Sequence, residues 1–572
     1  MKLEKTLIEM VGHFTPSRAS DWLRFLFSSY ETDAEPIAVD ATKNESAYFA
    51  EACRLGWVAR LPETDSAAAA NKPLVVVAVK MKGDLTERTS RLVQFAFAKK
   101  AIQNAIARGG RGIRGLPTQG LFFFYDADGY FRISLVSGEA DGRKLKYNSA
   151  KRQSFYVDPT AANNILRRRL GDPITTFAEL KNAFSVEQLT KEFYGRLFEW
   201  YTWALAPRTG VTFPNDLADK NDDRKYNHEA IIRLITRLMF TWFIRQKIPA
   251  LKELFERDGL DETLKGNRGK GKFNPDSMED DNYYRCILQN LFFATFNCPQ
   301  TGKGKLLRRW INVDLDERGD GKGLCGDFNV TTVYRYRNEF KDPDAFLERM
   351  RGVPFLNCAL FDCLDKAERK QDGGRKLYFD GFSSKIKRQA HVPNGLFFKE
   401  GRGIIDLFNG YEFTIDENSA DDADVALDPE LLGKVFENLL GAFNPETQET
   451  ARKATGSFYT PREIVDYMVE ESLKNYLKGK LGEGAKDPDA KLDDLFDRTK
   501  AAEGARTMFS RKEEEILLNA LYDCKVLDPA CGSGAFPMGV LHCMVRLLAR
   551  LDPDSVSIRE RLIARYRAAV GR

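Results

Sequence analysis

The stretch that decides the fold of the C-terminal part reads Val526-Leu527-Asp528-Pro529-Ala530-Cys531-Gly532-Ser533-Gly534-Ala535-Phe536. Two apolar residues lead to an acid, two glycines permit a sharp turn, and apolar residues up to Leu548 follow helical spacing. The stretch therefore predicts a strand, a glycine turn and a helix. Glycines let a ligand approach the backbone, and free N–H groups at a helix start favour an electron-rich group, so we expect a nucleotide-like ligand here.

Composition limits the kinds of protein to be considered. The 572 residues suit about three domains, and 87 basic against 83 acidic side chains leave a net charge of only +4. Any nucleic-acid surface must therefore consist of local patches. Nine cysteines without a CxxC pair and four histidines argue against a metal site or a disulfide framework. With no apolar signal core and no membrane-length apolar run, we expect a cytoplasmic protein without a membrane partner.

Residues 1–175 predict a mixed α/β module. Pro73–Lys80 reads as a buried strand, Arg88–Ile106 as a helix, and Leu121–Tyr125 with Tyr130–Val136 as a hairpin. This order resembles the core of PD-(D/E)xK nucleases, in which carboxylates and a lysine at a strand end hold a metal ion. Where that family has Glu-x-Lys, this chain has Ala78-Val79-Lys80. We therefore expect a degenerate module that serves as a scaffold or contacts DNA.

An alternative keeps this module as an active nuclease with other ligands. Its candidate residues are Lys80, Asp84 and Glu87. Cleavage that needs a divalent metal and is lost on Lys80→Ala would distinguish it.

Two glycine-rich basic segments are candidates for contact with DNA phosphates. The alternative is that they are solvated loops. Their cations are Arg108, Arg111 and Arg114 in the first segment and Arg268, Lys270 and Lys272 in the second.

Residues 176–425 predict a helical connector. Ser185–Leu205, Ile231–Phe243 and Tyr283–Phe296 are rich in apolar and aromatic residues at helical spacing. Such stripes are more often core than base-stacking platforms. The acidic segment Asp416–Asp424 then predicts a linker and a domain boundary.

Residues 426–572 carry the specific resemblance. Thr455-Gly456-Ser457-Phe458-Tyr459-Thr460-Pro461 resembles motif X, and the stretch from Asp528 to Phe536 resembles motif I, of gamma-class DNA methyltransferases. These enzymes methylate the amino nitrogen of adenine with S-adenosylmethionine. The likeness extends to large restriction-modification and phage-defence enzymes of type IIG or BREX-like kind. It implies that a Rossmann-like class I methyltransferase domain starts here.

The resemblance also implies the cofactor contacts. S-adenosylmethionine is cationic at sulfur, so its pocket needs a carboxylate and a close backbone approach. The alternative is a pair of generic helix-starting turns. The implied contacts are Thr455, Gly456, Tyr459, Thr460, Pro461, Asp528, Pro529, Ala530, Gly532 and Gly534.

The transfer motif of this family is missing from the sequence. Its Asn/Asp-Pro-Pro-Tyr/Phe tetrapeptide holds a flipped-out adenine, and no such tetrapeptide occurs in the 572 residues. We therefore assign no catalytic residue and expect this chain alone to be inactive. The expected partners are double-stranded DNA and a separate chain or further segment carrying transfer and target recognition, with other defence-system subunits as additional candidates. The alternative function is a non-catalytic scaffold or DNA-sensing subunit.

Overall fold

The computed structural model describes residues 2–563 except 41–44, 67, 86–87, 109–117, 142–143, 215–222, 303–304, 313–329, 368–375, 415–421, 428–459, 461, 483–485, 498–505, 530, 532–533, 554 and 562. The chain divides into two compact units. The first consists of Met1–Val186, Asn418–Ala426 and Tyr459–Arg572, and the second of Glu187–Glu417 and Leu427–Phe458.

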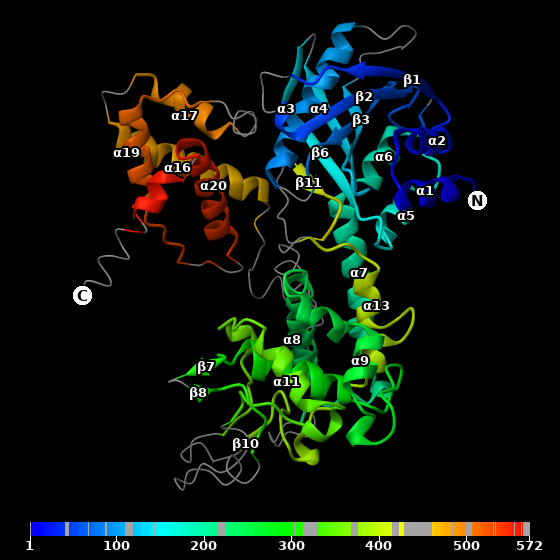
Figure 1. Cartoon of the computed structure of the whole chain (residues 1–572), viewed down its shortest axis with the longest axis vertical. Coiled ribbons are helices and arrows are strands. Elements are labelled where there is room, and N and C mark those ends of the chain that lie inside the picture. Colours follow the sequence, from blue (N-terminus) through cyan, green and yellow to red (C-terminus); the bar gives the residue numbers. More distant parts are fainter. Residues whose placement is uncertain are drawn as a thin grey trace. The chain divides into compact units, whose positions relative to one another are not determined.

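A seven-stranded mixed sheet dominates the N-terminal part (Figure 1). Its strands are β1 (Tyr30–Ile37), β2 (Phe49–Val58), β3 (Leu74–Met81), β4 (Gln119–Tyr125), β5 (Phe131–Asp141), β6 (Lys144–Val157) and β11 (Asp422–Asp424), in that spatial order. The helices are α1 (Lys2–Gly12), α2 (Pro16–Leu26), α3 (Glu45–Tyr48), α4 (Arg88–Arg108), α5 (Asn164–Leu170) and α6 (Phe177–Ala183). β3 pairs with β4 and β6 with β11 in parallel, and the other neighbours are antiparallel.

Both faces of this sheet are covered. On one face Phe122 and Phe124 share a core cluster with Phe97 of α4. On the other face the ring of Phe123 lies 5.6 Å from that of Phe14 and 6.3 Å from that of Trp22. Successive strand residues point to opposite faces, and here both faces are buried. The runs of apolar residues in β3 and β4 are therefore nearly continuous.

The strand, helix and hairpin predicted in this module are confirmed. β3 ends at Met81, α4 links it to the parallel strand β4, and β4 pairs with β5 so that Tyr125 lies opposite Phe131. A parallel pair needs such a crossover, and a helix is its usual form.

The end of the acidic segment Asp416–Asp424 differs from the predicted linker. Asp422–Asp424 form β11, and the N–H of Val425 donates to the carbonyl of Ser154 at 2.6 Å. Strand pairing uses backbone groups, so an acidic composition does not reveal it.

The second unit is mostly helical (Figure 1). Its principal helices are α7 (Val186–Ala204), α8 (Asp223–Ile244), η2 (Pro249–Phe255), α9 (Arg257–Thr263), η4 (Tyr283–Phe296), η6 (Arg337–Glu339), α11 (Pro343–Arg351), α12 (Gly395–Phe398) and α13 (Ile404–Asn409). Two short hairpins pair β7 (Thr301–Gly302) with β8 (Lys305–Leu306) and β9 (Lys366–Ala367) with β10 (Lys376–Leu377). α7, α8 and η4 confirm the three helices predicted from the sequence.

Helix η4 is the centre of this unit. All fourteen of its residues are buried, as its apolar composition predicts. It is a π-helix, in which backbone hydrogen bonds span five residues rather than four. The sequence cannot reveal that difference, because a fully buried helix has no exposed face to mark the helical period.

Buried ion pairs connect the helices of the second unit. The guanidinium of Arg285 on η4 donates to Glu339 at 2.7 and 3.0 Å and to Asp281 at 2.9 Å. On α8, Arg237 donates to Asp380 at 2.8 Å. All of these side chains are buried, so each charge replaces its lost hydration with an opposite charge.

Arg308 is held in a different way. Its guanidinium donates to the backbone carbonyls of Thr295, Cys298, Met350 and Val353 at 2.6–3.0 Å. Burial lowers the pKa of Arg308. Carbonyl oxygens thus take the place of water around this charge.

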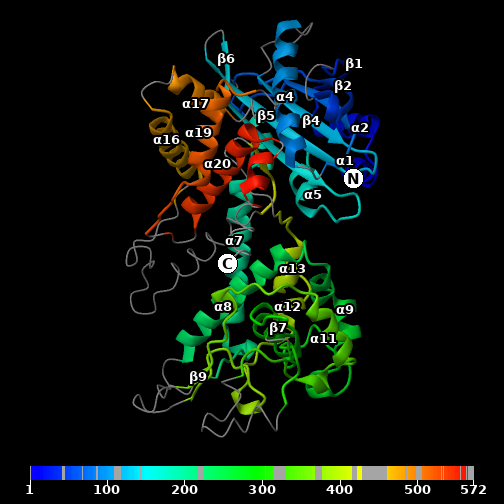
Figure 2. The same cartoon turned by 60° about the vertical axis from the view of Figure 1, so that its left-hand side comes forward.

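The C-terminal residues form a helical bundle (Figure 2). Its helices are α16 (Arg462–Leu481), α17 (Pro488–Phe496), α19 (Arg511–Tyr522) and α20 (Ala535–Leu551). They share one apolar core that includes Leu473, Leu477, Leu495, Leu517, Leu521 and Leu547. The sequence predicts helices over 462–477 and 536–548, and α16 and α20 confirm them with slightly wider bounds.

Neither a disulfide nor a membrane-crossing helix occurs among the described residues. The eight cysteines in those residues are free thiols. None of the helices in those residues combines the length and apolar character needed to cross a bilayer.

We predict that Arg237→Met lowers the free energy of unfolding by about 3 kcal/mol, because Asp380 would keep a buried charge without its cation. The matched control is Arg337→Met, which breaks an exposed pair with Asp344 and should cost less than about 1 kcal/mol. Urea unfolding followed by tryptophan fluorescence measures both. Equal losses in the two variants would contradict the prediction.

Candidate cofactor-binding site

The glycine turn before α20 is the first element of the site. The N–H of Gly534 donates to the carbonyl of Cys531 at 2.7 Å, and the N–H of Met538 donates to the carbonyl of Gly534 at 3.0 Å. Gly534 has a φ of 84°, a left-handed conformation that residues with a side chain rarely adopt. The helix thus begins where the sequence predicts it, and the turn requires glycine at 534.

The residues before the turn do not form the predicted strand. Lys525–Asp528 have no regular structure, and Val526 and Leu527 are 53% and 87% exposed. A strand needs a neighbour for its backbone hydrogen bonds, and the described residues between 462 and 563 contain no strand. The expected βα unit is therefore corrected to an exposed segment, a turn and a helix.

The close approach of α16 to α20 shapes the site. A Cβ atom on Gly539 of α20 would lie 2.8 Å from Cγ1 of Val465 on α16. That separation is shorter than a normal contact, so only glycine permits this packing. Gly539 therefore lets α20 lie close to α16 at this point.

A cavity of about 450 Å³ lies between α16, the exposed segment and the start of α20. Its walls are mostly apolar, with Leu473, Tyr476 and Phe536 among them. Asp528 is an acidic residue that lines this cavity and also lines an adjoining cavity of about 280 Å³. An apolar cavity with one carboxylate suits a small ligand that has a flat apolar part and a cationic group.

The elements that line the cavity also carry an exposed apolar surface. It is formed by side chains of α16, of α20 and of the segment before the turn. Its members are Ile464, Tyr467, Met468, Val526, Leu527, Met538, Leu541 and Val545. Some of these residues also line one of the two cavities, and exposed apolar side chains gathered in this way mark a place where another structural element packs.

Most of the motif X-like sequence lies outside the described residues. Thr455, Gly456, Tyr459 and Pro461 are among those left out, while Thr460 is half-buried shortly before α16. Ala530 and Gly532 of the second motif are also outside, and Pro529 is exposed and lines the larger cavity. The cofactor contacts implied by the resemblance stay a prediction.

The candidate nuclease residues lie at one edge of the sheet. Lys80 is half-exposed at the end of β3, and Asp84 is exposed just after it. Glu87 lies outside the described residues. Glu51 on β2 was not predicted from the sequence as part of this group. Its Oε1 lies 3.7 Å from the Nζ of Lys80. Only the strand register brings these two residues together.

Asp126 is a second acid at this edge, and it was not predicted from the sequence. Its carboxylate accepts backbone N–H groups of Leu85, Asp128 and Tyr130 at 3.0–3.4 Å. Burial raises its pKa. Its position directly after an apolar strand is the sequence feature that could have indicated it. Its hydrogen bonds show that it stabilises the turn between β4 and β5.

The candidate DNA-contacting cations have different surroundings. Arg268 hydrogen-bonds Gln389 and lies 3.6 Å from Asp281, so it takes part in the internal network of the second unit. Lys270 and Lys272 are exposed. The side chain of Arg108, together with Arg111 and Arg114, lies outside the described residues.

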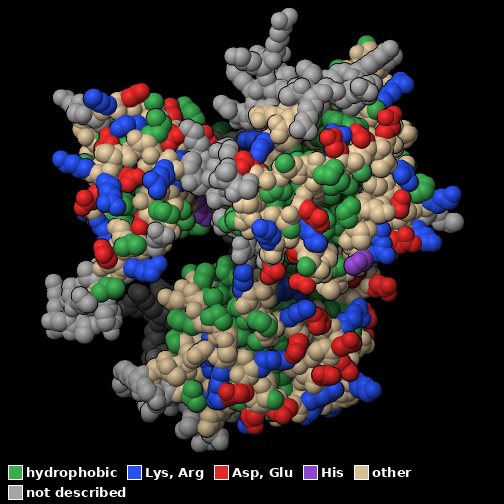
Figure 3. Space-filling view, turned by 45° about the horizontal axis from the view of Figure 1, so that its top comes forward, with side chains coloured by type: hydrophobic (Ala, Val, Ile, Leu, Met, Phe, Trp, Pro, Cys, Tyr) green, Lys and Arg blue, Asp and Glu red, His purple; other side chains and the backbone are tan. Residues whose placement is uncertain are grey.

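Charge of both signs is interspersed over the face shown in Figure 3. Lys and Arg alternate there with Asp and Glu among the described side chains. This agrees with the near balance of 87 basic and 83 acidic residues.

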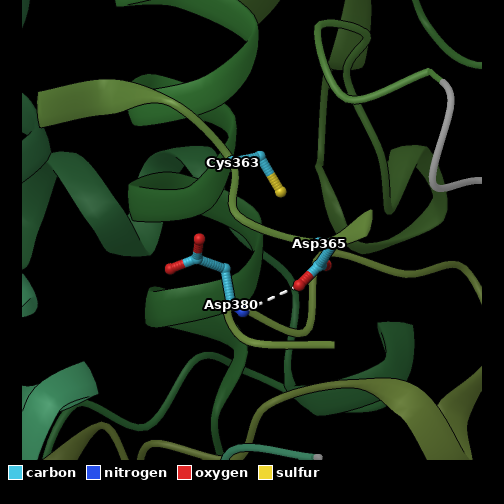
Figure 4. A group of neighbouring side chains, drawn as sticks. All are labelled: Cys363, Asp365 and Asp380. Atoms are coloured by element: carbon cyan, nitrogen blue, oxygen red, sulfur yellow. Dashed lines mark hydrogen bonds between the residues drawn. The ribbon is translucent and has the colours of Figure 1, made fainter. Parts of the chain in front are cut away.

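Cys363 and the buried Asp365 and Asp380 form a group in the second unit (Figure 4). Their possible ligand atoms lie within 4.8 Å of one another. However, every carboxylate oxygen already accepts a hydrogen bond: those of Asp365 from the N–H groups of residues 380–382, and those of Asp380 from Arg237 and the N–H of residue 364. Burial and the neighbouring Asp380 raise the pKa of Asp365 to about 6. The arrangement suits a structural crosslink rather than a metal site.

Comparison with known proteins finds one informative relative. The chain is 23% identical over 282 residues to a protein of Methanocaldococcus jannaschii described as a "putative type II restriction enzyme and methyltransferase". The match covers 47% of this chain and 18% of that protein, so the chain spans well under two thirds of its relative. No family model matches the chain. No solved structure matches it either.

We predict that Gly539→Ala destabilises the bundle by about 1–2 kcal/mol, because the new Cβ forces Val465 to move. The control is Gly479→Ala on α16, where no atom lies within 4 Å and the better helix former should stabilise by up to about 1 kcal/mol. Thermal unfolding followed by circular dichroism distinguishes them. Stabilisation by both substitutions would contradict the close packing of α16 on α20.

Proposed function

We propose that this chain supplies the S-adenosylmethionine-binding part of an adenine-specific DNA methyltransferase in a restriction-modification or phage-defence system. The observation that carries the proposal is the position of Asp528, an acidic residue that lines the cavity between α16 and α20. α16 follows the motif X-like sequence and α20 follows the motif I-like sequence. The helices that begin after the two motifs therefore enclose one cavity.

The chemistry of the cavity fits the proposed cofactor. S-adenosylmethionine has cationic sulfonium and ammonium groups, for which Asp528 offers a carboxylate. Apolar walls that include Phe536 and Val540 suit its adenosyl part, and about 450 Å³ is within the usual range for small-molecule sites. When bound, the cofactor supplies an electrophilic methyl group. The role of this chain is to hold and orient the cofactor.

Similarity to a relative described as a restriction enzyme and methyltransferase supports the reaction class and the setting. We propose double-stranded DNA as the substrate. Lys270 and Lys272, both exposed, are candidates for phosphate contacts.

Transfer to adenine requires a segment that these 572 residues do not contain. No Asn-Pro-Pro-Tyr-type tetrapeptide occurs in the sequence. We propose that such a segment, on a further part of the protein or on a partner chain, packs on the exposed apolar surface of the bundle. Val526 and Leu527 offer it an unpaired length of chain that a neighbouring strand would order.

We expect Asp528→Asn to weaken S-adenosylmethionine binding about tenfold or more, since a charge-assisted contact is lost. Titration calorimetry on the full chain measures this affinity. The control is Asp523→Asn, an exposed residue that does not line the cavity and should bind as the unmodified chain does. Equal affinities for all three proteins would remove the basis of the proposal.

We also expect the chain alone to transfer no labelled methyl group to plasmid DNA, because the transfer motif is missing. Adding a polypeptide with an Asn-Pro-Pro-Tyr segment should restore incorporation, and Asp528→Asn should lower it. Incorporation by the chain alone would contradict the need for a second segment. A complete lack of incorporation in the mixture would favour the non-catalytic scaffold or sensing role.

A further inference from the structure

A second cavity, of about 590 Å³, lies in the helical unit, far along the sequence from Asp528. It opens between the C-terminal half of α7, the turn that follows it, and the residues just before α13. The side chains that matter for its chemistry are Arg196, Phe198, Glu199, Trp203, Arg208 and Arg402.

Packing behind the cavity holds its walls in place. Phe193 of α7 stacks on Phe408 of α13 with ring centroids 6.1 Å apart. The buried Trp200, which lines the cavity, donates its indole N–H to the carbonyl of Leu396 at 2.8 Å. α7 and α13 are thus joined by core contacts, so the cavity is a formed feature of this unit.

The charge of the lining is positive. Arg196, Arg208 and Arg402 bring three guanidinium groups, against one carboxylate from Glu199. Within the part of the chain that the structure describes, none of the three arginines forms an ion pair, in contrast to Arg285. Their N–H donors are therefore available to an anion.

Aromatic rings position two of these cations. The guanidinium carbon of Arg402 lies 4.3 Å from the ring centroid of Trp203, and that of Arg196 lies 5.7 Å from the ring of Tyr411. Contact with a ring orients a guanidinium without using its hydrogen-bond donors. Phe198 is 38% exposed, so part of its side chain is free to pack against a ligand.

Guanidinium groups bind phosphate oxygens with paired hydrogen bonds, and exposed aromatic rings stack on nucleobases. A cavity of this volume also matches a nucleotide-sized ligand. We propose that this cavity binds a nucleotide, with its phosphate on Arg208 and Arg402 and its base against Phe198. The nucleotide is either part of a DNA strand or a free nucleotide, since the recognised groups are the same.

The test measures fluorescence anisotropy of the full chain with two probes. One is a labelled single-stranded oligonucleotide of about 16 nucleotides, and the other is a fluorescent adenosine triphosphate. Combining Arg208→Ala with Arg402→Ala should weaken binding of at least one probe about tenfold or more, and Phe198→Ala should weaken it to a similar degree. Glu199→Gln should strengthen binding, because it removes a negative charge from the lining.

The controls each remove one charge, positive or negative, elsewhere in the same unit. Arg337→Ala and Asp344→Asn alter an exposed ion pair outside the cavity and should change affinity less than about twofold. The altered side chains 198, 199, 208 and 402 are all exposed, so the variants should unfold at the same temperature as the unmodified chain.

The outcomes separate the two sources of the nucleotide. Loss of oligonucleotide binding alone assigns the cavity to a DNA strand, and loss of triphosphate binding alone assigns it to a free nucleotide. Failure of both probes to bind the unmodified chain overturns the proposal, as does a double variant that binds like Arg337→Ala. The inference does not rest on the cofactor proposal, because Asp528→Asn should leave both probe affinities unchanged.

Discussion

The buried ion pair between Arg285 and Glu339 is the interaction on which the helical unit depends. Every residue of η4 is buried, so the guanidinium on it cannot reach water and needs an opposite charge inside the protein. One carboxylate comes from Asp281, directly before η4, and the other from Glu339 of η6, so the ion pairs fix a distant stretch of chain against this helix. At its N-terminal end η4 is fixed again, where the N–H of Tyr283 donates to the side chain of Asn394 next to α12. The carbonyl of Leu396 in α12 in turn accepts the indole N–H of Trp200, which lines the second cavity.

The C-terminal bundle is held by apolar packing instead. Gly539 lets α20 approach α16, and leucines from four helices fill the space behind them. The same helices also present apolar side chains to solvent around Asp528. Burying that surface against a further structural element would be favourable by roughly 25 cal/mol for each Å² of apolar area. The exposed apolar surface and the missing transfer tetrapeptide lead to the same proposal, that catalysis needs another segment.

Arginine has two distinct roles in the second unit. Arg237 and Arg285 are buried and paired with carboxylates, which makes them parts of the scaffold. Arg208 and Arg402 are exposed at a cavity and pair with no described carboxylate. Composition cannot distinguish these two roles, because the net charge of +4 counts arginines of both kinds together. Burial and the position of the nearest acid separate them, and these are tertiary properties.

The sequence by itself determined the elements whose signal is local. These include the apolar strand β3, the helices α16 and α20, and the left-handed turn at Gly534, because periodicity and glycine act within a few residues. The tertiary structure alone decided the rest. It left Val526 and Leu527 without a neighbouring strand, paired Lys80 with Glu51 through strand register, and gathered arginines from α7 and the α13 region around one cavity. The physical reason is that strand pairing, burial and charge neutralisation depend on partners distant in the sequence.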